Sequence, residues 1–195
     1  KTSDPTTSYT IDRATLDHAQ ILNVSSLSTL LPGGKSTGDQ NLASSDERIA
    51  LRSGSSEMGN ASFGTAVTVD GVRLQNNSEM SETKGAGLRN ISSSNIESVE
   101  IITGIPSVEY GDLSNGIVKI NTRKGKTPFI IELATQPKTK QIAISKGFLL
   151  GDRAGTINTS LERTKSTSDL ASPHTAYDRN SLTLTYSNTL NRKAQ

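Results

Sequence analysis

The sequence predicts an α+β fold in which a small domain around a mixed sheet is followed by a run of antiparallel strands. Residues 94–125 have the pattern of strand, glycine-containing loop and strand. Upstream, helical segments alternate with strands but without the strict strand-helix-strand rhythm of a parallel α/β sheet. After residue 125, apolar and polar side chains alternate through several further segments.

The hairpin within residues 94–125 is the clearest local prediction. Val99 and Ile101 alternate with more polar positions over residues 96–102, which indicates a strand with one buried face. Alternation resumes over residues 117–122 after a short loop. Three loop glycines are expected to meet backbone demands of tight turns rather than to contact a ligand: Gly104, Gly111 and Gly116.

The segments before the hairpin are shorter and separated by polar loops. Residues 24–31 place Val24, Leu27, Leu30 and Leu31 on one face of a helix, with Asn23 as its N-cap. The remaining predicted elements are a strand at 9–11, a helical turn at 12–18, a strand at 48–52, and a strand at 65–72 that ends in Asp70-Gly71. Residues 1–8 and 75–88 are predicted to lack regular structure.

Four alternating segments follow residue 125. Their apolar positions are Phe129, Ile131 and Leu133; Ile142, Ile144 and Phe148; Ile157 and Leu161; and Leu182, Leu184 and Tyr186. This pattern fits consecutive antiparallel strands of an outer-membrane barrel, and by itself it fits an ordinary soluble sheet equally well. Because a barrel closes with about eight strands at minimum, the barrel interpretation implies that the chain is a fragment.

Composition argues against several classes of function. Hydrophobic residues make up 32% and aromatic residues 4%, which predicts a thin aliphatic core. The net charge of +2 gives no basis for nucleic-acid binding, and the absence of cysteine excludes disulfides and thiolate metal sites. His18 and His174 lack acidic partners at ligand spacing, so we expect no metal and no cofactor. No apolar run approaches the ~18 residues of a membrane helix. The chain begins at Lys1 without a positively charged n-region or an apolar h-region, so any export signal is expected to have been removed or to lie upstream.

Catalytic patterns are weak. Residues 33–37 imitate the end of a phosphate-binding loop, but the first glycine of that motif is replaced by Thr29. Glu97 and Glu100 would point to opposite faces of a strand, which prevents them from acting as an acid and base on one substrate. The sequence therefore does not predict an enzyme.

Several blocks, in order along the chain, resemble the plug domain of TonB-dependent outer-membrane receptors, in particular those of Bacteroidetes. The blocks are Leu31-Pro32-Gly33, Leu51-Arg52-Ser53-Gly54, Val69-Asp70-Gly71-Val72, Ile96-Glu97-Ser98-Val99-Glu100-Ile101, Tyr110-Gly111, Asn115-Gly116-Ile117-Val118-Lys119-Ile120 and Thr122-Arg123-Lys124-Gly125. Ser53 is an insertion relative to the family pattern. The resemblance covers most of residues 9–125.

This resemblance implies a domain organisation and a role. Residues 1–8 would be a flexible N-terminal segment, residues 9–125 a four-stranded plug, and residues 126–195 the first strands of an incomplete barrel. The change in composition after Gly125 separately predicts that residues 126–195 are weakly attached to the plug. The plug would occlude the barrel of an outer-membrane receptor in a Gram-negative bacterium, contribute to ligand binding and gate energised nutrient uptake. Expected partners are the TonB protein, the remainder of the barrel, the outer membrane, a cargo ligand of unknown identity and a surface lipoprotein.

The resemblance also suggests candidate site residues. Polar loops facing the outside supply candidate ligand contacts: Met58, Asn60, Arg73, Gln75 and Asn76. Charges that would pair with the inner barrel wall are Arg52, Glu100 and Arg123. The alternative is a non-transport surface binding module with an α+β fold. A reading frame that continues past Gln195 with further alternating segments of about ten residues would favour the receptor.

Overall fold

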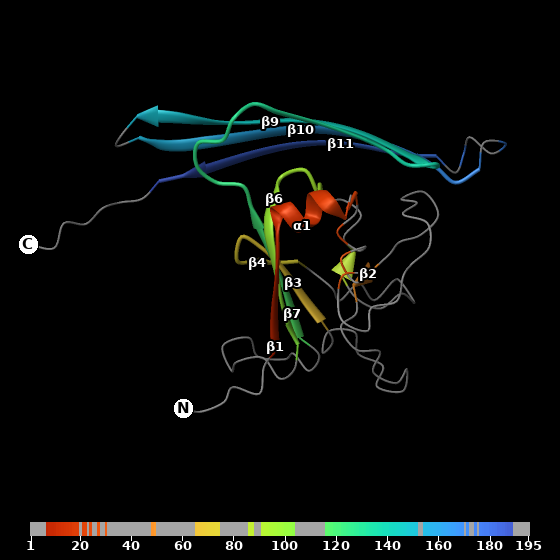
Figure 1. The fold of residues 1–195 in the computed structure, drawn as a ribbon, viewed down its shortest axis with the longest axis horizontal. Coiled ribbons are helices and arrows are strands. Elements are labelled where there is room, and N and C mark those ends of the chain that lie inside the picture. The colour runs from red at the N-terminus through yellow and green to blue at the C-terminus, as the bar shows by residue number, and fades with distance from the viewer. Residues whose placement is uncertain are drawn as a thin grey trace, which may run out of the picture.

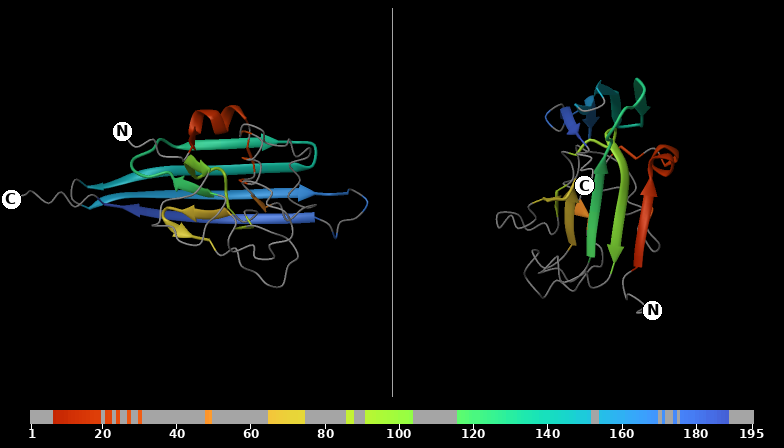
Figure 2. Two further views of the ribbon diagram at one scale, coloured as in Figure 1. Left: turned by 90° about the horizontal axis from the view of Figure 1, so that it is seen from below. Right: turned by 90° about the vertical axis from the view of Figure 1, so that its left-hand side faces the viewer.

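The protein folds into a five-stranded mixed sheet and a four-stranded antiparallel sheet that lies across one end of the strands of the first (Figure 1). Figure 2 shows the same arrangement from two other sides. The computed structural model describes residues 7–19, 21, 22, 24, 27, 30, 48–49, 65–74, 86–87, 91–103, 116–151, 154–169, 171, 174 and 176–188.

The five-stranded sheet has the strand order β1-β6-β7-β3-β4. Its strands are β1 (Thr7–Asp12), β6 (Ile96–Thr103), β7 (Gly116–Thr122), β3 (Thr65–Val69) and β4 (Val72–Arg73). The predicted hairpin is confirmed, because β6 and β7 pair antiparallel. β3 runs parallel to β7, which makes the sheet mixed. The expected number of four strands is too low by one, because β4 is a short fifth strand at the edge of the sheet.

A tight turn at Asp70-Gly71 creates this extra strand. β3 ends at Val69 instead of continuing to residue 72, and Val69 pairs with Val72 across the turn. Both turn residues have positive φ, 49° at Asp70 and 86° at Gly71, as a two-residue hairpin turn of type I′ requires. The sequence Val69-Asp70-Gly71-Val72 therefore encodes a reversal rather than the end of a longer strand.

The first strand leads directly into a short helix. β1 begins at Thr7, so two residues of the segment expected to be flexible belong to a strand. α1 (Arg13–His18) is the predicted helical turn, and the Asp12 side chain caps it by accepting a hydrogen bond from the Thr15 N–H. Val24, Leu27 and Leu30 have 3₁₀ conformation. Their spacing of three suits that helix, whose side chains align at i and i+3.

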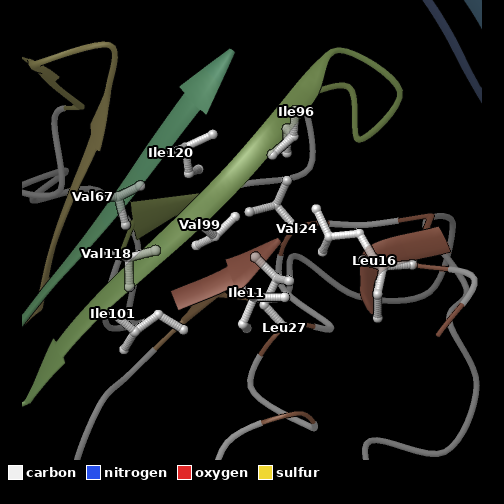
Figure 3. Close-up of a cluster of buried hydrophobic side chains, with 11 residues drawn as sticks. Ile11, Leu16, Val24, Leu27, Val67, Ile96, Val99, Ile101, Val118 and Ile120 are labelled. Atoms are coloured by element: carbon white, nitrogen blue, oxygen red, sulfur yellow. The ribbon is translucent and has the colours of Figure 1, made fainter. Parts of the chain in front are cut away.

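The core is thin and aliphatic, as the composition predicts, and lies between the mixed sheet and the segment around α1 (Figure 3). Val99 and Ile101 of β6 point into it, which confirms the buried face predicted for that strand. Its members are Ile11, Leu16, Ile21, Val24, Leu27, Val67, Ile96, Val99, Ile101, Val118 and Ile120. Burial of these side chains supplies the main stabilisation of the domain.

A small third sheet joins two distant segments. β2 (Arg48–Ile49) pairs antiparallel with β5 (Ala86–Gly87). The prediction that residues 75–88 lack regular structure is therefore wrong in part, because β5 lies within them.

Several residues singled out in the sequence lie outside the described residues: Asn23, Leu31, residues 50–52, Gly104 and Gly111. Gly116 has φ of 136°, so a backbone demand for glycine is confirmed at that position.

All four alternating segments after residue 125 are strands. They are β8 (Ile130–Thr135), β9 (Thr139–Gly151), β10 (Gly155–Thr167) and β11 (Ala176–Ser187), each antiparallel to the next. No helix in the described part of the chain is long and apolar enough to cross a membrane.

Candidate functional site

The four-stranded sheet has its polar and apolar faces reversed relative to a soluble protein. Its apolar side chains are exposed, with Leu133 at 75% and Leu182 at 65% relative accessibility. Its polar side chains face the five-stranded sheet and are buried: Thr139, Gln141, Ser145, Asn158, Ser160, Glu162, Thr164, Ser166 and Arg179. Polar-inward and apolar-outward alternation is the pattern of a transmembrane barrel wall. The interface between the two sheets is therefore the candidate functional site.

Glu162 is the centre of a buried cluster in this interface. It lies on β10 and is 1% exposed. Its Oε1 accepts hydrogen bonds from Arg179 Nε at 2.9 Å and Thr164 Oγ1 at 3.0 Å. Its Oε2 accepts from Gln141 Nε2 at 3.1 Å and from the Ser92 hydroxyl. A buried carboxylate is tolerated when it is paired with an opposite charge and its oxygens accept hydrogen bonds, and this one meets both conditions.

Residues 91–94 of the plug-like domain insert into this polar face. Arg179 Nη1 donates to the Ile91 carbonyl at 3.2 Å, so the guanidinium links β11 to that segment. Ser92 reaches Glu162, and the hydroxyls of Ser94 and Ser160 lie 3.5 Å apart. Short polar side chains allow a close approach while satisfying the buried polar groups of the wall.

A second cluster of charges lies around Glu132 of β8. Glu132 Oε1 accepts hydrogen bonds from Arg13 Nη2 at 3.1 Å and Arg123 Nη2 at 3.2 Å. Arg13 belongs to α1 and also donates through Nη1 to the carbonyls of Ser93 and Ile96. Arg123 donates to Ser145 Oγ on β9 at 3.3 Å. Two arginines from the first domain therefore hold one carboxylate of the second sheet.

The connection between the domains packs closely against β9. Gly147 N donates to the Thr127 carbonyl at 3.2 Å, and Asn158 Nδ2 donates to the Gly125 carbonyl at 2.9 Å. A Cβ at Gly147 would lie 2.4 Å from the Gly125 oxygen and 2.5 Å from Thr127 N. Glycine at position 147 is thus required by space rather than by its own backbone angles.

These contacts connect residues 126–195 with the first domain, and the weak attachment expected for that segment stays a prediction. The ion pair of Arg123 with Glu132 joins the two sheets at one cluster, and the hydrogen bond from Ser92 to Glu162 joins them at the other. Four charged residues of these clusters were not predicted as site residues from the sequence: Arg13, Glu132, Glu162 and Arg179. The available signal was the alternation: Glu132 stands between the outward-facing Ile131 and Leu133, and Glu162 follows the outward-facing Leu161.

The predicted charge-pairing residues lie in different places. Arg123 lies at the interface, where it contacts Glu132 and Ser145. Glu100 lies 3.4 Å from Lys119 on the neighbouring strand β7, within the same sheet. Arg52 lies outside the described residues, and the role of all three in pairing with a barrel wall stays a prediction.

The structure describes only one of the five residues predicted to contact a ligand. Arg73 is exposed on β4, directly after the Asp70-Gly71 turn. Met58, Asn60, Gln75 and Asn76 lie outside the described residues. Among the residues that are described, no group of three or more His, Asp or Glu side chains could hold a metal ion.

Two aspartates of the first domain have lowered pKa values. Hydrogen bonds from the hydroxyl and N–H of Thr15 lower the pKa of Asp12, the N-cap of α1. Burial alone would raise the pKa of Asp70, but hydrogen bonds from the Thr122 hydroxyl and N–H, together with the Lys124 ammonium at 3.0 Å, bring it below its usual value. Asp70 therefore ties the turn between β3 and β4 to the end of β7.

The fold and the interface define a class of protein: a small mixed-sheet domain packed on the polar inner face of strands from the start of an outer-membrane barrel. The family described as TonB-dependent Receptor Plug Domain matches residues 1–118. Because this match covers more than half of the sequence, the chain belongs to that family. The plug domain and the fold class predicted from the sequence are confirmed.

Solved structures have the same fold. One is a mutant ferric enterobactin receptor from Pseudomonas aeruginosa in complex with enterobactin, with a TM-score of 0.59 and 15% identity, covering 89% of this chain and 27% of that one. A second mutant of that receptor gives a TM-score of 0.56 and 14% identity, covering 83% of this chain and 25% of that one. The chain thus spans about a quarter of the length of these receptors. No curated protein matches it.

Proposed function

We propose that the chain is the plug and the first wall strands of an outer-membrane receptor that imports a ligand with energy supplied through TonB. The plug occludes the barrel formed with the remainder of the receptor, contributes to ligand binding and gates uptake. The chain acts in transport and not as an enzyme, and it resides in the outer membrane of a Gram-negative bacterium. A Bacteroidetes-type receptor and a surface lipoprotein partner are narrower predictions from the sequence.

The observation that carries this proposal is the polar interface between the two sheets. Polar side chains are buried between the plug and the wall, among them Glu162, Arg179, Gln141 and several hydroxyls. If the plug moves, water can replace the hydrogen bonds that these groups make across the interface. An apolar interface of the same size would resist such hydration. A plug held by hydrogen bonds and ion pairs is therefore suited to displacement by a pulling partner.

Connection lengths support an orientation in the membrane. Outer-membrane barrels have short periplasmic turns and longer outer loops. The β10–β11 connection spans residues 168–175, whereas the β9–β10 connection spans 152–154. The β8–β9 turn is at the same end as the longer connection, since Thr167 N donates to the Lys138 carbonyl at 2.9 Å. We assign that end to the outside.

The cargo contacts proposed from the sequence remain Met58, Asn60, Arg73, Gln75 and Asn76. They stand in polar stretches of the sequence, and Arg73 is exposed on β4; such side chains offer adaptable hydrogen bonding and little aromatic stacking. Alanine replacement of Asn60, Arg73 and Gln75 in the full receptor should weaken equilibrium binding of the cognate ligand. Wild-type binding by all three variants would assign recognition to other loops.

A reversible tether between plug and wall tests the gating proposal. The chain has no cysteine, so an introduced pair reports on one contact alone. Ser94→Cys with Ser160→Cys replaces two buried hydroxyls 3.5 Å apart, one on each side of the interface. We expect oxidation of the full receptor in cells to stop ligand uptake and a reductant to restore it, because the plug can no longer leave the wall.

A matched pair within the wall controls for the effect of a disulfide itself. Thr139→Cys with Ser166→Cys joins β9 to β10, where the hydroxyls are 2.9 Å apart and the residues are directly opposite. This pair should leave uptake unchanged when oxidised. Undiminished uptake by the oxidised Ser94–Ser160 pair, or uptake that persists without TonB, would contradict the proposed function.

A further inference from the structure

A crevice of about 310 Å³ lies between α1 and β8. Its apolar wall comes from the plug, with Leu16, Ile21 and Leu22. Its polar wall includes Arg13, Glu132 and Gln141. The volume is at the lower end of the range for small-molecule pockets, about 300–1000 Å³.

Gln141 brings an unused acceptor to this crevice. The side chain is 94% buried, and its Nε2 donates to Glu162, which does not line the crevice. Because a carboxylate only accepts, this bond fixes the amide orientation and leaves Oε1 as the remaining polar atom of a side chain that lines the crevice. Oε1 has no hydrogen-bond partner among the described residues. Such a buried acceptor is costly unless a donor reaches it.

Arg13 supplies a complementary donor. Its two terminal nitrogens are occupied by Ser93, Ile96, Asp17 and Glu132. Its Nε is also buried, and it too lacks a partner within the described part of the chain. Two side chains that line the crevice thus each carry one buried, unmatched polar atom, an acceptor on Gln141 and a donor on Arg13, beside an apolar wall.

The surrounding charges give an anion no net attraction. Asp17 and Glu132 both line the crevice, and Arg13 is the single cation among the lining side chains in the described residues. Arg123 does not line it but lies 3.2 Å from Glu132, so two negative charges are balanced by two positive charges. A carboxylate or phosphate would lose its hydration there without gaining an unpaired cation among these residues. A hydroxyl or an amide can donate to Gln141 and accept from Arg13 at a smaller desolvation cost.

We propose that the crevice binds a small uncharged solute carrying hydroxyl or amide groups, such as one sugar unit or a short peptide unit. It is a second contact point for cargo, next to the β8–β9 turn on the side assigned to the outside. This assignment rests on the proposed function, because it takes the solute to be the receptor's cargo. Anionic cargo would gain nothing from this contact.

Binding of simple probes to the purified full-length receptor tests the proposal. Saturation-transfer NMR with glucose, N-acetylalanine amide and glucuronate compares a hydroxylated, an amide and a charged probe. We expect glucose, the amide or both to bind, and glucuronate to bind more weakly. Gln141→Met removes the acceptor at similar size and should weaken binding about tenfold. Ala134→Phe fills the crevice from β8 and should abolish it.

Thr164→Val is the matched control. It removes one hydrogen bond to Glu162, as Gln141→Met does, but Thr164 does not line the crevice, so probe binding should stay at the wild-type level. Absence of binding by both uncharged probes, equal binding by wild type and Ala134→Phe, or equal binding of glucuronate would overturn the inference. If the receptor imports its cargo but the probes fail these tests, the proposal that the crevice binds a solute is refuted, whereas the proposed function as a receptor is not.

Discussion

Arg179 of β11 donates two hydrogen bonds, from Nε and Nη2, to a single oxygen of Glu162 on β10. Both residues are buried, at 5% and 1% exposure, and both also contact the plug, Arg179 through the Ile91 carbonyl and Glu162 through Ser92. The pair therefore organises the wall and holds the plug segment at the same time. Removal of either residue would leave an uncompensated charge at the interface.

We expect Glu162→Leu to lower the free energy of unfolding by about 3–5 kcal/mol, because Arg179 would remain buried without its carboxylate. Calorimetric unfolding of the purified protein measures the change. The double variant Glu162→Leu with Arg179→Leu is the control, since it removes both charges and should recover much of the loss. A double variant as unstable as the sum of the two single variants would contradict this account.

Acid should weaken the link between Asp70 and β7. The pKa of folded Asp70 lies below its ordinary value of 3.8, so the ionised form favours folding. Its contribution is present above pH 3.8 and is lost as the pH falls through the lower folded-state pKa. We expect Asp70→Asn to cost about 1 kcal/mol at neutral pH, and the gap from wild type to close in acid. A gap that widened below pH 3.8 would contradict the assignment.

Gly147→Ala should destabilise the junction between the domains by about 1–3 kcal/mol, because the new methyl group would collide with the backbone of Gly125 and Thr127. Urea unfolding measures the cost. Ser181→Ala changes a half-buried residue of β11 away from this connection, and we expect less than about 0.5 kcal/mol there. Equal effects of the two substitutions would show that the connection adjusts freely.

Glu132→Gln should loosen β8 from the plug, since Arg13 and Arg123 would lose the carboxylate that they share. We expect amide hydrogen exchange in β8 and residues 91–96 to become about tenfold faster. Glu100→Gln is the matched control, because it breaks a more exposed pair with Lys119 inside the plug sheet. Exchange that is unchanged in Glu132→Gln would mean that the hydrogen bonds of Glu162 hold the sheets together unaided.

Local sequence was sufficient for the strands with strong alternation. Val99 and Ile101 identify β6, and the apolar positions after residue 125 identify β8 to β11, because side chains on a strand repeat every two residues. The resemblance of several blocks predicted the plug family. Short elements were less predictable: β4 depends on the turn at Asp70-Gly71, and β5 has two residues, too few for a period to appear.

The sequence by itself determined the strand pattern, the plug motif and the presence of one polar and one apolar face on the second sheet. Tertiary structure decided which charges meet. Arg13 and Glu132 are 119 residues apart, and Ser92 and Glu162 are 70 apart. No periodicity relates such positions, because their contact depends on how two sheets pack. The interface could therefore be identified only from the packing of the plug against the inner face of the wall.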